Sequence, residues 1–148
     1  MKTIFEQATR DELINRINSL NDNSVAQWGQ MNVYQMVKHC RMWEEMINGD
    51  ITCKRSFLGR IFGRLALKNA VKDDRPMMKK AAASQEVIVT ELSGDLTAEK
   101  NKWISLMQGH AHFSNVDFIH PFFGRMTKEE IGYFAYKHSD HHLRQFNS

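Results

Sequence analysis

Two histidines near the end of the chain, His138 and His142, lie four residues apart in a segment predicted to be helical. Residues four apart on an α-helix are about 40° apart around its axis and one turn apart along it, so both imidazoles share a face. Paired helix histidines of this kind chelate divalent metals in zinc sites. His141, three residues after His138, competes with His142 for the second position of the pair. A metal site also needs a third ligand from elsewhere in the chain.

His39 is the candidate third ligand, because it lies one position from the apolar stripe of an earlier predicted helix. In helical bundles, metal sites are built in the core from side chains on facing helices. Three protein ligands leave one coordination position for water or substrate, which is typical of catalytic and not of structural zinc-type sites. The alternative is that His39 is a partly buried polar side chain bonded to a carbonyl. The residues alone leave both interpretations open.

The other polar residues near these positions have two interpretations each. Asp140 is either an acceptor for the N–H of a ligand or, more commonly, a solvated charge. Gln145 either faces the site or caps the end of its helix. No general base follows from spacing, since neither Asp140 nor Glu45 is placed at the metal by its position in the sequence. Three histidines at a helix end or in loops, where surface histidines are common, are assigned no chemistry: His110, His112 and His120.

The elements that must position the three candidate ligands are helices. Apolar side chains recur at helical spacing after five start signals, which are Thr9, Asn32, Ser56, Asp95 and Thr127. Residues 77–92 lack this period, and residues 87–89 are extended in character, so a long crossover is expected there. The pattern predicts an all-α protein of four or five helices, for which a helical bundle is the natural architecture.

Length and composition indicate one soluble globular domain spanning residues 1–148. Hydrophobic residues make up 42% of the chain and charged residues 25%, which is ordinary for such a protein. No apolar run is long enough to span a bilayer, and the first residues lack the apolar core of a signal peptide. We therefore expect a cytoplasmic location and no membrane partner.

Basic residues concentrate in one segment, Lys54–Lys80, which holds nine of them against two acidic residues. Four recur at four-residue spacing and are expected to lie opposite the apolar face of the third helix: Arg60, Arg64, Lys68 and Lys72. Such a stripe is usually a solvated face, and otherwise contacts an anionic partner. No nucleic-acid motif accompanies it and no aromatics alternate with the charges, so a nucleic-acid partner is not expected. The apolar face itself is expected to point inward: Phe57, Leu58, Ile61, Phe62 and Leu65.

Three blocks of the chain carry a resemblance to a known family: residues 31–40 (MNVYQMVKHC), 120–130 (HPFFGRMTKEE) and 136–146 (YKHSDHHLRQF). They resemble the DinB-like proteins, a branch of the DinB/YfiT superfamily of metal-binding four-helix bundles. The likeness spans the chain from about Trp28 onward, and the last block is its most specific part.

The resemblance implies a four-helix bundle with a long crossover, assembled as a homodimer. In that superfamily a histidine of the second helix and an H-x-x-x-H pair of the last helix bind a divalent metal, usually zinc or nickel. The matching positions in this sequence are His39, His138 and His142. Relatives use the metal to activate a low-molecular-weight thiol for transfer, or act as hydrolases or isomerases.

These observations lead to the hypothesis of a metal-dependent enzyme that acts on a small molecule, with thiol transfer ahead of hydrolysis. A metal held by three neutral imidazoles keeps its positive charge and lowers the pKa of a bound water or thiol. Because the thiolate is the attacking species, metal coordination suits thiol transfer. The competing hypothesis is a non-catalytic binding or interaction bundle, whose three-histidine site is structural or empty.

Overall fold

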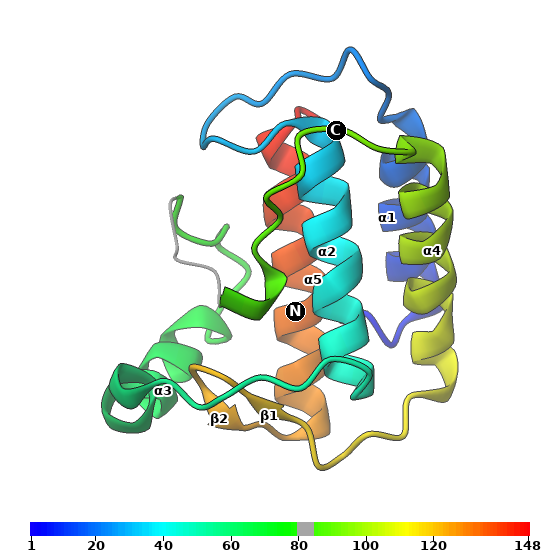
Figure 1. Cartoon of the computed structure of the whole chain (residues 1–148). Helices are drawn as coiled ribbons and strands as arrows, with labels where there is room; N and C mark the ends of the chain where they lie inside the picture. Colours follow the sequence, from blue (N-terminus) through cyan, green and yellow to red (C-terminus); the bar gives the residue numbers. More distant parts are fainter. Residues whose placement is uncertain (80–84) are drawn as a thin grey trace.

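The computed structural model of this chain describes residues 1–79 and 85–148, and it is built mainly of helices (Figure 1). In these residues five α-helices follow one another: α1 (Gln7–Ser19), α2 (Val33–Asn48), α3 (Phe57–Ala70), α4 (Leu96–Gly109) and α5 (Lys128–Gln145). Two 3-10 turns, η1 (Gln85–Val87) and η2 (His110–His112), precede and follow α4. The expected all-α class is confirmed.

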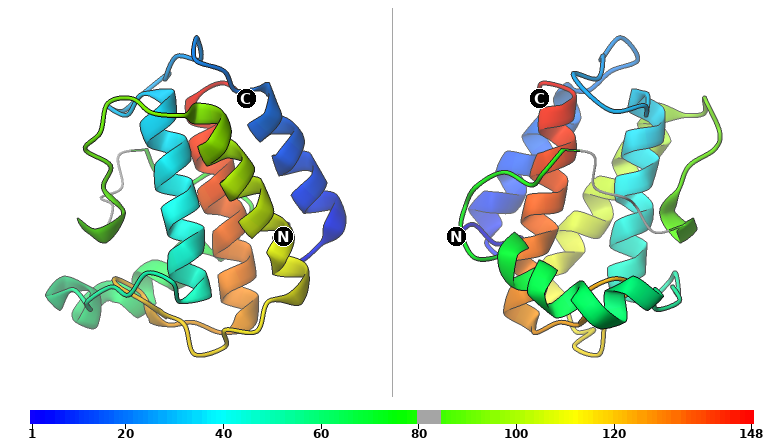
Figure 2. Two further views of the ribbon diagram at one scale, coloured as in Figure 1. Left: turned by 45° about the vertical axis from the view of Figure 1, so that its right-hand side comes forward. Right: turned by 90° about the vertical axis from the view of Figure 1, so that its left-hand side faces the viewer.

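Four of the helices, α1, α2, α4 and α5, lie side by side, whereas α3 lies at the outer edge of the molecule (Figures 1 and 2). Helix α2 packs against both α4 and α5, and α1 packs against the same two helices. Apolar side chains from all four helices fill the space between them, and each fully buried one contributes about 1.5–3 kcal/mol. The largest include Leu13, Ile17, Met36, Ile47, Trp103, Met107, Ile131 and Leu143. Within the described residues, no helix is long and apolar enough to cross a membrane.

The two helices that carry the candidate ligands begin at the predicted capping boxes. At the start of α2, the Asn32 side chain accepts from the Gln35 backbone N–H at 2.9 Å, and the Gln35 side chain accepts from the Asn32 backbone N–H at 3.1 Å. At the start of α5, the Thr127 side chain accepts from the Glu130 backbone N–H at 3.1 Å, and the Glu130 side chain accepts from the Thr127 backbone N–H at 2.8 Å. These caps satisfy backbone donors that the first turn leaves unpaired. Both predicted starts are confirmed.

The predicted capping box of the first helix, by contrast, is wrong. Helix α1 begins at Gln7, before Thr9, and no side chain caps its first turn. The chain entering the helix is held instead by Arg10, whose guanidinium donates to the carbonyls of Ile4 and Phe5 at 3.0 and 2.7 Å. The arginine thus fixes the chain before the helix through two carbonyls, but it does not cap the N–H groups of the first turn.

Helix α3 begins at its predicted cap, Ser56, whose side chain accepts from the Gly59 backbone N–H at 2.9 Å. It ends at Ala70, before the predicted break at residues 74–76. Its predicted orientation is wrong, because the inward face consists of Gly59, Gly63 and Leu67. The apolar face expected inside is exposed by 54–75%: Phe57, Leu58, Ile61, Phe62 and Leu65.

The basic stripe of α3 consequently borders its exposed apolar face and does not lie opposite a buried one. Arg60, Lys68 and Lys72 are exposed. Arg64 donates to the Arg125 carbonyl at 3.0 Å and pairs with Glu130 at 3.2 Å. The helix is thereby attached to the hairpin and to the first turn of α5.

The chain after α3 forms the expected crossover along α2. Residues 80–84, which include Lys80 of the basic segment, lie outside the described residues. The stretch predicted to be extended begins instead in the 3-10 turn η1, with Val87 and Val89 buried. Its backbone is tied to the start of α2, since Asn32 donates to the Leu92 carbonyl at 2.7 Å and Gln35 to that of Val89 at 3.2 Å.

The segment before α5, predicted to be irregular, contains a short antiparallel hairpin. Its strands are β1 (Ile119–His120) and β2 (Gly124–Arg125), with Ile119 opposite Arg125 and His120 opposite Gly124. Gly124 has a φ of 85°, which favours glycine at the hairpin turn.

Candidate metal centre

Three imidazoles from two helices meet in the interior between α2 and α5: those of His39, His138 and His142. One ligand nitrogen from each lies within 4.8 Å of the other two, and all three residues are buried. The Nε2 atoms of His39 and His138 are 3.3 Å apart. Two nitrogens at about 2.0–2.1 Å from one tetrahedral zinc would be about 3.4 Å apart, so the distance between His39 and His138 and the donor type of all three residues fit such an ion. The sequence-based expectation that these three side chains converge is met, while metal binding itself stays a prediction.

His39 is oriented by the crossover chain. Its Nδ1 lies 2.8 Å from the Val87 carbonyl oxygen. Because a carbonyl only accepts, Nδ1 carries the hydrogen and Nε2 presents its lone pair to the other two rings. His39 is therefore a buried histidine bonded to a carbonyl, and that bond directs its other nitrogen towards His138 and His142, while its role as a ligand stays a prediction.

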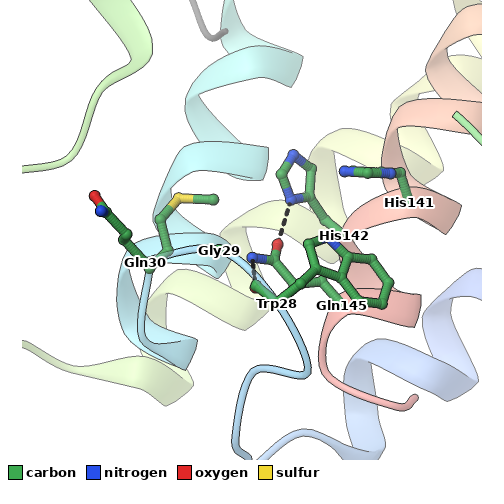
Figure 3. Close-up of a pocket in the computed structure, with 7 residues that line it drawn as sticks. Trp28, Gly29, Gln30, His141, His142 and Gln145 are labelled. Atoms are coloured by element: carbon green, nitrogen blue, oxygen red, sulfur yellow. Dashed lines mark hydrogen bonds between the residues drawn. The ribbon is translucent and has the colours of Figure 1, made fainter. Parts of the chain in front are cut away.

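His142 is oriented by Gln145, the residue one turn further along α5 (Figure 3). The Gln145 amide nitrogen donates to the Trp28 carbonyl at 2.7 Å, which leaves its oxygen 3.0 Å from His142 Nδ1. Nδ1 is therefore the donor, and Nε2 presents its lone pair. The loop approaches closely at Gly29, whose φ is 83° and where a Cβ would lie 2.5 Å from the amide nitrogen of Gln145. The structure therefore favours the interpretation in which the Gln145 side chain faces the site.

His138 is held by packing. The Trp43 ring stacks on its imidazole with centroids 4.4 Å apart and planes 23° apart. Its Nδ1 is buried and has no hydrogen-bond partner among residues 1–79 and 85–148. Nε2 faces His39, so the nitrogen directed into the centre is set by ring stacking and not by an outer hydrogen bond.

All three histidines are held in the neutral form. Burial lowers the pKa of His39, lowers that of His142 to about 3, and lowers that of His138 well below its usual value. The neighbouring imidazoles add to the effect at His138 and His142, since a second positive charge nearby is unfavourable. Neutral imidazole is the form that binds metals, so no proton has to leave before an ion enters.

A pocket of about 590 Å³ adjoins the centre, and His142 lines it. Figure 3 shows the loop after α1 on one side and the end of α5 on the other. His141, the alternative to His142, lines this pocket and does not belong to the three-histidine group. Its ring lies 5.8 Å from that of Trp28, and burial lowers its pKa. The remaining lining residues are Trp28, Gly29, Gln30, Met31 and Gln145.

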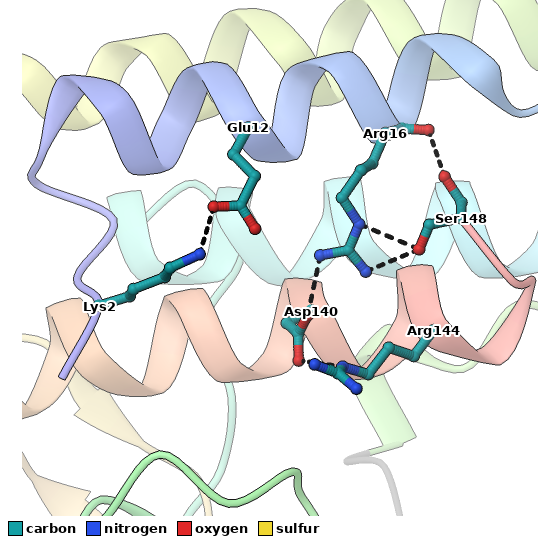
Figure 4. A network of polar contacts seen from close by, with 6 residues as sticks. All are labelled: Lys2, Glu12, Arg16, Asp140, Arg144 and Ser148. Carbon is teal, nitrogen blue, oxygen red and sulfur yellow. Dashed lines mark hydrogen bonds and ion pairs between the residues drawn. The ribbon is translucent and has the colours of Figure 1, made fainter.

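Asp140 lies on α5 between the two ligands but takes no part in the centre (Figure 4). Its carboxylate accepts from Arg16 at 2.8 Å and from Arg144 at 2.7 Å. Arg16 also donates to the Ser148 carbonyl at 3.0 and 2.8 Å. Asp140 is only 7% exposed, so its interpretation as a solvated charge is wrong. It joins α5 to α1 and so fixes the helix that bears both histidines.

Glu45 is likewise occupied elsewhere. It pairs with Arg41 at 2.5 Å, and Arg41 also pairs with Glu99 of α4 at 2.7 Å. This network links α2 to α4, and it supplies no base to the centre.

Two histidines that were expected in surface positions are buried. His110 Nε2 lies 2.6 Å from a carboxylate oxygen of Glu44 in a pair that is 1% and 0% exposed. Glu44 sits four residues after Cys40 on the inward stripe of α2, and this misplaced acid is the signal that could have revealed the pair. His120 Nδ1 accepts from two backbone N–H groups of the hairpin, and burial lowers its pKa to about 3. Only His112 is exposed.

Aromatic side chains around the hairpin pack on one another. Phe123 stacks on His120 at 4.4 Å and meets Phe134 edge-on at 4.8 Å.

Comparison with known protein families identifies the chain and corrects the resemblance drawn from its sequence. Residues 4–148 match the family described as "Protein of unknown function (DUF1569)", and the chain belongs to that family. No DinB or YfiT family matches, and DUF1569 is distinct from the DinB-like family, so that resemblance is wrong. No curated protein and no solved structure matches the chain. The resemblance rested on short histidine-bearing blocks, whose spacing any helical bundle with inward histidines shares.

Proposed function

We propose that this member of the DUF1569 family is a metal-dependent enzyme that acts on a small molecule. One divalent ion, zinc or nickel, would be held by His39, His138 and His142. The observation that carries the proposal is the convergence of three neutral imidazoles within 4.8 Å, one of which also lines a pocket. The expected cytoplasmic location is part of the same proposal.

The donor set supports a catalytic and not a purely structural ion. Structural zinc sites are closed by four protein ligands, whereas three leave one position open. Among the described residues the group contains no carboxylate and no thiol. A divalent ion bound there would keep its full charge and lower the pKa of a water or thiol at the open position.

The protein's own residues supply orientation around that position. Val87 and Gln145 fix the hydrogens of His39 and His142 on their outer nitrogens. Such partners hold the ring planes and raise the basicity of the ligand nitrogens. Arg16 and Asp140 fix α5 itself, so the two ligands on this helix cannot turn away together.

The pocket supports a small molecule as the substrate. Trp28 and Met31 offer apolar surface, while Gln30 and His141 offer polar groups. The lining thus combines apolar surface with several polar groups that could orient a small molecule. We propose attack by a low-molecular-weight thiol on an electrophilic substrate as the first reaction class, with attack by water as the second.

The test combines metal content with turnover. Purified protein should contain about one divalent ion per chain by elemental analysis, and dialysis against a chelator should remove it without loss of helical circular dichroism. A panel of electrophiles is then assayed with a small thiol or with water. Turnover should require the ion and vanish in His142→Ala, and His112→Ala, a change at an exposed histidine, should keep it.

Two results would decide against this function. Unfolding on chelation would assign the ion a structural role. Absence of stoichiometric binding of zinc, nickel or manganese would mean an empty site, and the enzymatic proposal would fail.

A further inference from the structure

Helix α3 carries its small residues inward and its large apolar residues outward. Its inner face lies directly on the main chain of the hairpin turn. A Cβ at Gly59 would lie 2.4 Å from the Phe122 carbonyl oxygen, and one at Gly63 would lie 2.2 Å from the same atom. Only glycine permits this approach, so the helix cannot rotate to bury a larger face. Leu67, which is fully buried, completes the contact.

The outward face forms a continuous apolar surface that we call the α3 stripe. Its members are exposed as follows: Phe57 75%, Leu58 59%, Ile61 59%, Phe62 54% and Leu65 65%. At 100° per residue these five positions fall within an arc of about 140°. Single exposed apolar residues are ordinary, but five large ones on one helix face mark an interaction site.

A basic border runs along the α3 stripe. Arg60 is exposed beside the stripe and Lys68 is exposed one turn beyond its last residue, and neither forms an ion pair within residues 1–79 and 85–148. Helix α3 contains no acidic residue, and Lys54 adds positive charge before its start, whereas Asp73 and Asp74 offset Lys72 after its end. The surface therefore combines an exposed apolar helix face with uncompensated positive charge.

We propose that the α3 stripe docks on an anionic lipid surface, independently of the function assigned to the three histidines. The apolar side chains enter the boundary between headgroups and acyl chains, and Arg60 and Lys68 lie at the level of the lipid phosphates. Helices that lie in a membrane interface have this combination of phenylalanine and leucine with flanking basic residues. The cytoplasmic leaflet of cell membranes supplies the negative charge.

The position of α3 suits a planar partner better than a second copy of the chain. Figure 2 shows the helix on the outside of the molecule, crossing near one end of α2 and α5. A second copy would offer its own basic border and no acidic residue along its α3, so self-association gains no complementary charge. The proposal departs from the sequence-based expectation of no membrane partner, because that expectation placed the α3 stripe in the core.

Sedimentation with lipid vesicles tests the proposal on the full chain. Vesicles of phosphatidylcholine alone are compared with vesicles containing about 30% phosphatidylglycerol. The protein should sediment with the anionic vesicles, and added salt should weaken binding because the charge is exposed. The double variants Phe57→Ser with Phe62→Ser, and Arg60→Gln with Lys68→Gln, should each weaken binding by about tenfold or more.

Matched controls separate the stripe from general surface effects. Leu92→Ser changes an apolar residue that is 74% exposed outside α3, and Lys102→Gln removes an exposed charge on α4. Both should bind vesicles as the unchanged chain does, and all variants should keep their helical circular dichroism and zinc content. Lack of binding to anionic vesicles, or binding that the α3 variants leave unchanged, would overturn the proposal. A dimer in the absence of lipid that Phe57→Ser with Phe62→Ser dissociates, without vesicle binding, would assign the stripe to a second copy.

Discussion

Helix α2 contributes to two buried histidine clusters, and the two differ in what their nitrogens face. In one, His110 meets the Glu44 carboxylate at 2.6 Å, a donor opposite an acceptor. In the other, His39 meets two further imidazoles, and the outer hydrogen bonds at Val87 and Gln145 turn the lone pairs of His39 and His142 inward. The first cluster pairs a donor with an acceptor, although His110 Nδ1 and the second oxygen of Glu44 have no partner among the described residues. The second joins three imidazoles, with one ring-to-ring hydrogen bond between His39 Nε2 and His138 Nε2 at 3.3 Å.

Burial alone therefore does not identify a functional histidine in this protein. Six of the seven histidines are buried, all but His112; of these His110 pairs with a carboxylate and His120 accepts from two backbone N–H groups. What distinguishes the candidate centre is convergence of lone pairs next to a pocket, a feature that a divalent ion satisfies. Neither His110 nor Glu44 lines that pocket.

The largest expected effect is on metal affinity. His138→Ala removes one of three ligands and should weaken zinc binding by more than about 100-fold, since loss of an outer partner alone typically costs 10–100-fold. His110→Gln should leave the affinity unchanged. Competition against a chromophoric chelator measures both. Equal losses in the two variants would erase the distinction between the clusters.

The second expected effect is on stability and falls on the other cluster. His110→Leu leaves the buried Glu44 carboxyl without its partner and should lower the free energy of unfolding by about 3–5 kcal/mol. In the metal-free protein His138→Leu should cost less, because no buried carboxyl loses its hydrogen-bond partner there. Urea denaturation of the metal-free variants provides the measurement.

Glu45→Gln is the matched control for this prediction, since it alters a more exposed ion pair one residue away. It should cost at most about 1 kcal/mol. A loss in His110→Leu no larger than that of the control would show that the buried pair adds little to stability.

The smallest expected effect is on the pH dependence of stability. It arises from His120, a buried histidine that belongs to neither of the two clusters. Burial lowers its pKa from 6.5 to about 3 in the folded chain. Below pH 6.5 the unfolded chain therefore binds a proton that the folded chain does not, so stability is lost as the pH falls towards 3. At pH 5.5 this single group should account for about 1.4 kcal/mol.

Urea midpoints at neutral pH and at pH 5.5 are measured for the unchanged chain and for His120→Asn. The difference between the two pH dependences is the contribution of His120. His120→Asn keeps a side-chain acceptor for the hairpin N–H groups but does not titrate there, so its stability should change less with pH. His112→Asn, at an exposed position, should behave as the unchanged chain. A pH dependence in His120→Asn equal to that of the unchanged chain would contradict the assignment.

The helices that bear the ligands could be predicted because their signals are local. The capping boxes at Asn32 and Thr127 fix where α2 and α5 begin, and helical spacing then places His138 and His142 on one face. The partners that orient the ligands could not be predicted. Val87 and Trp28 act through backbone carbonyls, which any residue type would provide.

The orientation of α3 was mispredicted for a general reason. Apolar periodicity finds the apolar face of a helix but assumes that this face is buried. In α3, Gly59 and Gly63 are four residues apart and lie on a second face of the helix. Because they have no side chains, this face can pack on the main chain of the hairpin turn. The spacing of the two glycines was the available sign that the large residues point outward.

The most direct test of the central claim is the coordination of zinc in the loaded protein, measured by X-ray absorption at the zinc edge and by anomalous diffraction. We expect one ion per chain, with three imidazole nitrogens, those of His39, His138 and His142, at about 2.0–2.1 Å and one further light-atom ligand. Zinc bound through cysteine sulfur or carboxylates at another position, or no stoichiometric zinc at all, would contradict it.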